Sequence, residues 1–296
     1  MHYHNPFHQK RHTTKASHGI KFVTSITTTI ALILVCALAV SQIIPTGRTD
    51  RSAKVAQGKT TRSKKPVKTT FTPASGEFRG VWISFQDIGE KRYTKKQFEN
   101  FINKTFDNCK KNGFNAVIVH VRPFADALYP SSYFPWSRYV SGKAGKHPGF
   151  DPLSYAVSAA HKRGLAFHAW INPYRIASNT TNVYKLPKKS IARKWAVSKK
   201  ASKRRNVLKW DGKLYFNPAS KDVQNLVCNG VREIVRDYAV DGIHFDDYFY
   251  PTTDAAFDKA SYEKYCADAK NPIALDDWRR ANVNTLLAGC RAAIKS

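Results

Sequence analysis

Four segments of the chain alternate apolar and polar residues with the period of two that is typical of β-strands. They are residues 78–84, 115–122, 165–172 and 241–246. Three segments between them have helical spacing of apolar residues or helix start and stop signals, namely 95–112, 151–163 and 217–238. Two more helices are expected at 257–267 and 275–294. Strands that alternate with helices in this way predict an α/β fold with a parallel sheet.

Each predicted strand ends in a polar residue on the face opposite its apolar outer positions. These residues are Ser84, Arg122, Asn172 and Asp246. Side chains at the carboxyl ends of parallel barrel strands meet at one mouth, where such folds carry their chemistry. The sequence therefore predicts a shared polar pocket at these four strand ends.

Asp246 and the adjacent Asp247 are the candidate catalytic residues. Period two places Ile243 and Phe245 on the outer face of their strand, and His244 and Asp246 on the inner face. Paired carboxylates are common where protonation is tuned, and a hydrogen-bonded loop cap is the structural alternative. The spacing of His244, Asp246 and Asp247 also permits a metal site. Because no further ligand cluster accompanies them, we predict neither a metal nor another cofactor.

The first 76 residues are expected to precede the folded domain. Residues 1–21 form a basic leader, and residues 22–44 carry no charge over a length that spans a bilayer as a helix. The positive flank predicts a cytoplasmic N-terminus and an extracellular domain, so the chain is expected at the cell membrane with a single span. Residues 45–76 have the composition of a disordered linker. Secretion after cleavage near 37–39 is the alternative.

The net charge of +28 extends beyond the leader into the folded domain. Basic charge suits an anionic cell-wall polymer or solubility near an anionic surface. Because no zinc-finger, homeodomain or RNA-binding signature accompanies the charge, no nucleic acid partner is predicted. The five cysteines are far apart without a C-x-x-C motif, so zinc is not expected and spacing predicts no disulfide.

Five motifs together resemble glycosyl hydrolase-like family 10, a bacterial cell-envelope group with a (β/α)8 barrel. They are Phe78-Arg-Gly-Val-Trp-Ile-Ser, Val119-His-Val-Arg-Pro, His168-Ala-Trp-Ile-Asn-Pro-Tyr, Tyr215-Phe-Asn-Pro and Asp241-Gly-Ile-His-Phe-Asp-Asp-Tyr-Phe-Tyr-Pro. The resemblance covers residues 77–296 and implies hydrolysis of a glycan, such as peptidoglycan strands. It also implies kinship with barrel glycosidases whose nucleophilic aspartate ends strand four. Their Gly-x-Arg-x-Asp pattern maps onto Gly242-x-His244-x-Asp246, and this match favours Asp246 over Asp247 as the nucleophile. The chain departs from the pattern in having histidine in place of arginine.

Only four strand–helix units are counted, whereas the family's barrel has eight. The resemblance therefore predicts that residues 77–296 form the N-terminal half of a TIM-type barrel, truncated after the fourth unit. Such a half-barrel has an open strand edge that invites association. Hydrolysis also requires a second carboxyl group as general acid, which the resemblance places on a later strand outside this chain. Asp87, Glu90 and Asp126 lie at the correct end and are interpreted as loop charges or caps.

The remaining candidate residues are expected to bind the glycan. Polar contacts are predicted for Ser84, Arg122, His168, Asn172 and His244, and apolar platforms for Trp82, Trp170, Tyr174, Tyr248 and Tyr250. The predicted function is that of a membrane-tethered extracellular glycoside hydrolase acting on a cell-wall-type glycan. A non-catalytic glycan-binding module, or an inactive fragment, is the alternative.

Overall fold

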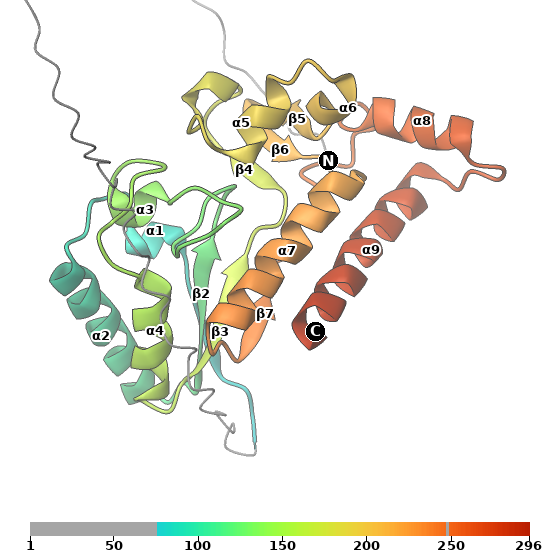
Figure 1. Cartoon of the computed structure of the whole chain (residues 1–296). Coiled ribbons are helices and arrows are strands. Elements are labelled where there is room, and N and C mark those ends of the chain that lie inside the picture. Colours follow the sequence, from blue (N-terminus) through green and yellow to red (C-terminus); the bar gives the residue numbers. More distant parts are fainter. Residues whose placement is uncertain (1–75, 247–248) are drawn as a thin grey trace, which may run out of the picture. The chain divides into compact units, whose positions relative to one another are not determined.

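The computed structural model describes residues 76–246 and 249–296 (Figure 1). The predicted leader, membrane helix and almost all of the linker lie outside these ranges, as do Asp247 and Tyr248. Within the described ranges, no helix has the length and apolar character needed to span a membrane.

A parallel sheet forms the centre of the described domain. Its strands are β1 (Gly80–Ile83), β2 (Ala116–Arg122), β3 (Ala166–Ile171) and β7 (Gly242–His244), in the order β1-β2-β3-β7. All three neighbouring pairs are parallel. The prediction of an α/β fold with a parallel sheet is confirmed, and each strand lies within a predicted segment. This order is that of successive strands in a parallel β/α barrel.

Helices cover the outer face of this sheet (Figure 1). They are α2 (Lys95–Lys111), α4 (Pro152–His161) and α7 (Lys221–Asp237), and α9 (Leu275–Lys295) packs along α7. Thr94 caps α2 through a capping box with Gln97, as its position before the apolar periodicity indicates. Asp151 caps α4, with proline at the first helical position. The predicted helices are thus present, with ends that differ by a few residues.

An insert between β3 and α7 folds into its own small sheet. The strands β4 (Arg175–Ala177), β6 (Lys213–Phe216) and β5 (Val207–Trp210) pair antiparallel in that order. The insert also contains three short helices: η1 (Val183–Lys185), α5 (Ile191–Ala196) and α6 (Ala201–Arg204). No acidic residue occurs between Asp151 and Asp211, so almost all charged residues of the insert are Lys or Arg. The net charge indicated basic residues in the folded domain, but no regular structure was predicted within this insert.

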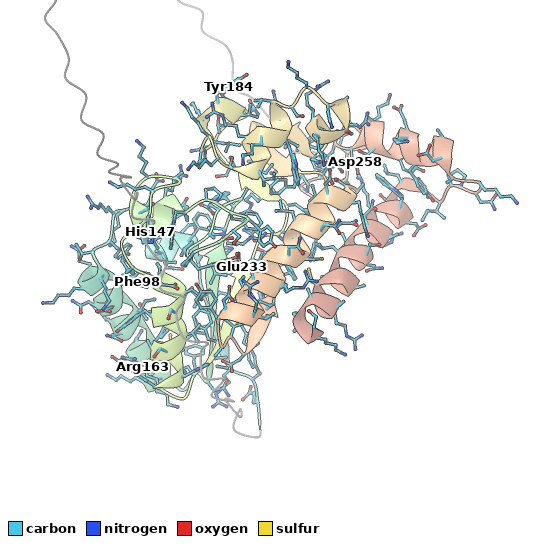
Figure 2. All side chains as sticks on the ribbon, viewed as in Figure 1. Phe98, His147, Arg163, Tyr184, Glu233 and Asp258 are labelled. Atoms are coloured by element: carbon cyan, nitrogen blue, oxygen red, sulfur yellow. The ribbon has the colours of Figure 1, made fainter. Side chains whose placement is uncertain are left out.

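Two short helices lie in the loops at the carboxyl ends of the first strands. They are α1 (Phe85–Ile88), which follows β1 directly, and α3 (Arg138–Ser141), which lies in the loop after β2. We call residues 124–139 of this loop the aromatic loop, because six of them are Phe, Tyr or Trp. The aromatic loop is attached to α7 through Glu233 (Figure 2). The Glu233 carboxylate accepts hydrogen bonds from the Ser131 hydroxyl at 2.5 Å and the Ser132 backbone N–H at 2.7 Å.

The Arg122 side chain points in the opposite direction from the one predicted. A regular strand would place His120 and Arg122 on the same inner face, but the register shifts between them, so that Arg122 pairs with the outer-face residue Ile171. A β-bulge of this kind adds a residue and redirects the following side chain. Arg122 is therefore 1% exposed beneath α7 and does not reach the inner face.

Gly230 of α7 makes room for Arg122. A Cβ at this position would lie 2.5 Å from Arg122 Nη1, and the guanidinium stacks on the Phe134 ring at 3.8 Å. Burial lowers the pKa of Arg122, while the nearby Tyr129 and Glu233 oppose that shift. Arg122 therefore joins β2, the aromatic loop and α7, and its role is structural.

A buried ion pair holds the C-terminal helices to the loop after β7. Arg279 of α9 contacts Asp258, with Nη2 2.6 Å from Oδ1. Asp258 lies just before α8 (Lys259–Asp268) and is labelled in Figure 2. The same guanidinium donates to the carbonyl oxygens of Thr253 and Asp254. The arginine thus connects α9 to both the loop and the start of α8.

Candidate functional site

The inner face of the sheet carries aromatic and histidine side chains in two adjacent rows. In one row Trp82, Ile118, His168 and Gly242 are register partners across the four strands. In the next, toward the carboxyl ends, His120, Trp170 and His244 are partners. Because partners in register share a face, these rows bring several predicted binding residues together.

Gly242 is needed for the position of the His168 ring. A Cβ on Gly242 would lie 2.8 Å from His168 Cε1 and Nδ1, so a larger residue would displace the imidazole. Phe78 packs on the other side of His168, with ring centroids 5.2 Å apart. Burial lowers the pKa of His168, although Asp241 opposes the shift. The imidazole is therefore neutral at neutral pH.

His120 stacks on Trp170 with ring centroids 3.4 Å apart and nearly parallel planes. Burial is the main reason that the pKa of His120 falls to about 3, and the Asn172 side chain opposes this shift. The Phe85 backbone N–H donates to His120 Nδ1 at 3.4 Å, so Nε2 carries the ring proton. The sequence left His120 open between a hydrogen-bonded filler of the barrel interior and a substrate contact, and the stack makes it part of the aromatic surface.

His244 connects this surface to Asp246. Trp82 Nε1 donates to His244 Nε2 at 3.2 Å, which leaves the ring proton on Nδ1. Burial lowers the pKa of His244, and the Asp246 carboxylate opposes the shift. Asp246 is half-buried just beyond the end of β7. A carboxylate thus lies at the carboxyl ends of the strands, beside an imidazole that contacts both Trp82 and Trp170.

The other predicted binding residues differ in whether they lie at the carboxyl ends of β1–β3, as Asn172 and Ser84 do, or form a second group. Asn172 is buried beside His120 and donates from Nδ2 to the Pro123 carbonyl oxygen at 3.0 Å, so it borders the inner-face cluster. Ser84 caps α1, where its hydroxyl accepts from the backbone N–H groups of Gln86 and Asp87. Tyr174 and Tyr250 belong to the second group, which lies away from the cluster.

Tyr174 and Tyr250 are packed toward the C-terminal helices. Tyr174 is 1% exposed, and burial strongly raises its pKa. Asn282 Nδ2 of α9 donates to the Tyr250 hydroxyl oxygen at 3.5 Å. The Arg279 guanidinium lies over the Tyr250 ring, 5.2 Å from its centroid. Tyr174 fills the interior, and Tyr250 is half-buried against α9. Tyr174 therefore presents no open apolar platform, and glycan contact stays a prediction for both residues.

The loop carboxylates at this end of the sheet are occupied by local interactions. Asp87 accepts from the Ser84 backbone N–H and hydroxyl as part of the α1 capping box. Glu90 pairs with Arg138 at 3.2 Å. Both observations fit the interpretation of Asp87 and Glu90 as caps or loop charges. Within residues 76–246 and 249–296, no group of three or more His, Cys, Asp and Glu side chains is arranged to hold a metal ion.

Asp126 lines a cavity of about 200 Å³ between the aromatic loop and the insert. Burial raises its pKa to about 6, against hydrogen bonds from Ser137 and the Phe124 backbone N–H that favour the charged form. Apolar side chains such as Ile176 and Leu186 form much of the cavity wall. The sequence showed an acidic residue within an aromatic loop, but no periodicity could reveal that the insert folds over it.

Replacing Asp126 with asparagine is expected to stabilise the protein above pH 6. Because the folded-state pKa exceeds the ordinary value of 3.8, folding favours the protonated carboxyl, so the wild type loses stability as pH rises from about 4 to 6. The neutral amide avoids this loss, and the gain at pH 7.5 should be about 1–3 kcal/mol. Urea denaturation of both proteins at pH 4 and 7.5 measures it, with Asp254→Asn as an exposed control. Equal stability differences at the two pH values would contradict the assignment.

Parallel strands in barrel order, with aromatic side chains and a carboxylate at one end, place the domain in the class of β/α-barrel-like proteins. A model of the family Glycosyl hydrolase-like 10 matches residues 77–296. The chain belongs to this family, and the resemblance predicted from the five motifs is confirmed.

Two curated relatives carry the name glycosyl hydrolase. YngK of Bacillus subtilis is 42% identical over 231 residues, and DigH of Escherichia coli K12 is 32% identical over 245 residues. The alignments cover 74% and 78% of this chain, but 42% and 55% of the relatives. The chain thus spans about half the length of the curated relatives it matches.

Among solved structures, the PgaB (BpsB) glycoside hydrolase domain from Bordetella bronchiseptica aligns with a TM-score of 0.49 and 12% identity. That alignment covers 74% of this chain and 62% of the other.

Proposed function

We propose that this chain contributes to the hydrolysis of a glycan, with Asp246 as the nucleophile or as the carboxylate that stabilises an oxocarbenium ion. The observation that carries the proposal is the position of Asp246, at the carboxyl end of the parallel strands beside His244, which accepts a hydrogen bond from Trp82. Membership of a glycosyl hydrolase-like family supports the reaction class. The names of YngK and DigH support it further, although both relatives extend well beyond the part that this chain matches.

The inner-face cluster has the chemistry of a sugar-binding surface. Trp82 is 55% exposed, and its indole gives an apolar plane on which a pyranose ring can stack. The neutral His168 and His244 imidazoles can donate to or accept from sugar hydroxyls without adding charge. Tryptophan with a few fixed polar groups is the usual lining of small-molecule sites. We therefore assign glycan contact to this cluster and keep Arg122, Tyr174 and Tyr250 out of it.

The second carboxyl group is proposed to come from outside the described strand ends. Asp87 is committed to a helix cap and Glu90 to an ion pair, so neither is a suitable proton donor. Retaining and inverting glycosidases both need this group, at roughly 5–5.5 Å or 6.5–9.5 Å from the first. Until such a group is supplied, the same surface would bind a glycan without cleaving it. This dependence is why a glycan-binding module remains the second candidate.

The two candidates are separated by measuring binding and cleavage on the same material. The protein is incubated with purified cell-wall glycan strands, and both the bound fraction and the reducing ends released are determined. Release above that of a boiled sample supports hydrolysis, whereas binding without release supports the module. If the protein neither binds nor cleaves any of a panel of wall glycans, the proposal of a glycan site on the inner face fails.

We further propose that the domain acts outside the cell membrane, anchored by residues 22–44, on a wall-type glycan. The uncharged length of that segment and the positive flank before it support the anchor. The basic insert supports contact with an anionic wall polymer, since it contains no acidic residue between Asp151 and Asp211. Fractionation of cells that express the chain with and without residues 1–44 tests the anchor.

A further inference from the structure

Two cysteines lie opposite each other where α7 and α9 pack together. The Sγ atoms of Cys228 and Cys290 are 3.7 Å apart, within hydrogen-bonding distance for sulfur. Gly289 leaves the space for the Cys228 thiol, because a Cβ there would lie 2.8 Å from the sulfur. The two residues are 62 positions apart in the sequence, so their contact arises only from the packing of the two helices.

The two thiols differ in exposure and in charge. Cys290 is buried, whereas Cys228 is half-buried and is the one that a solution reagent reaches first. The hydrogen bond with Cys290 is the largest cause that lowers the pKa of Cys228 to about 7, and Arg232 and Lys221 add to the effect. The pKa of Cys290 is raised, so this residue keeps the shared proton. Cys228 is therefore the nucleophile of the pair, because the thiolate is the reactive form.

We propose that Cys228 and Cys290 form a thiol–disulfide exchange site, at which a small-molecule disulfide converts the pair into an intrachain bond between α7 and α9. In the first step the Cys228 thiolate attacks one sulfur of the external disulfide. A mixed disulfide forms, the external S–S bond breaks, and the leaving thiolate takes a proton. In the second step Cys290 loses its proton and attacks Cys228 Sγ, which expels the second thiol. Two electrons pass from the cysteines to the reagent, which is reduced to two thiols.

The geometry needs little change to complete this reaction. A disulfide has its sulfurs about 2.05 Å apart, so the two atoms must approach by roughly 1.7 Å for the bond to form. The other described cysteines lack such a partner: Cys109 is buried on α2, and Cys266 is half-buried on α8 beside Tyr262. In the described part of the chain the reaction is therefore specific to one pair.

The consequence of oxidation is a covalent link between the C-terminal helix and the sheet-covering helix α7. The bond closes a loop of about 60 residues, which restricts the unfolded chain and favours the folded one. For a domain of this size the midpoint of thermal unfolding should rise by roughly 5–10 °C.

The test uses the purified full chain in buffers of oxidised and reduced glutathione, followed by trypsin digestion and mass spectrometry. We expect a cross-link between peptides 222–232 and 281–291, and its loss after treatment with dithiothreitol. The Cys290→Ser variant should instead accumulate a glutathione adduct on Cys228, at least about tenfold faster than on Cys266. The Cys109→Ser and Cys266→Ser variants are matched controls that should still form the cross-link.

Two results would overturn the proposal. One is modification of Cys266 before Cys228 in the folded protein, with no cross-linked peptide pair at equilibrium. The other is an unfolding midpoint that does not change on oxidation of the wild type, since the bond would then not restrain α9. Both readouts are independent of glycan cleavage, so they hold whether or not the proposed hydrolase function is correct.

Discussion

Replacing Asp246 with asparagine is expected to reduce glycan cleavage roughly 10³-fold or more, because the amide cannot act as a nucleophile or carry the negative charge. The substitution keeps the size and shape of the side chain just beyond β7. Glycan binding through Trp82 and the neighbouring imidazoles should therefore survive. Reducing-end release and glycan pull-down, measured on the same preparation, give the two quantities.

The matched control for this substitution is Asp254→Asn. Asp254 is an exposed carboxylate in the loop that follows the same strand, where it accepts a hydrogen bond from the Ala256 backbone N–H. An asparagine oxygen can accept that bond, so activity should remain at the wild-type level. If Asp246→Asn keeps more than about a tenth of the activity, Asp246 is not the nucleophile. Circular dichroism of both variants establishes that the fold is unchanged.

Replacing Arg279 with alanine is expected to lower the free energy of unfolding by about 3–5 kcal/mol. The side chains of Arg279 and Asp258 are 7% and 0% exposed, so truncation leaves a buried carboxylate without its partner. The carbonyl oxygens of Thr253 and Asp254 lose their donors as well. Denaturant unfolding followed by tryptophan fluorescence measures the change, since Trp278 lies next to Arg279 in α9.

Arg280 provides the control for Arg279 within the same helix. Its guanidinium pairs with Asp277 at the surface, where both side chains are more than half exposed. Exposed pairs contribute little, so Arg280→Ala should change the free energy of unfolding by less than about 0.5 kcal/mol. A similar loss in the two variants would mean that helix propensity, rather than the buried ion pair, explains the effect.

The strands and the covering helices could be predicted because their signals are local. Alternation marked the strands of the parallel sheet, and the apolar spacing of Phe98, Ile102 and Phe106 marked the buried face of α2. The cap at Thr94 follows from the side chain's own hydrogen bond to the first turn. None of these features depends on which distant segment packs against them.

The candidate site was only partly predictable because side-chain direction depends on packing. Period two assigned His168, Trp170 and His244 to the inner face, where the structure places them. The same rule failed at Arg122, because a register shift after His120 is not visible in one strand's sequence. Tyr174 and Tyr250 follow strand ends, but the helix that covers them begins at Leu275. The contact between Cys228 and Cys290 is equally non-local.

Gly230 has a consequence for the position of β7 along the sheet. The Arg122 guanidinium fits against α7 only where the helix lacks a side chain. An axial slip of α7 by one turn, about 5.4 Å, would bring Leu226 or Ile234 over the charge. The helix therefore docks at a single axial position. Because β7 starts five residues after α7 ends, the axial position that Gly230 allows α7 also limits where along β3 the strand before Asp246 can pair.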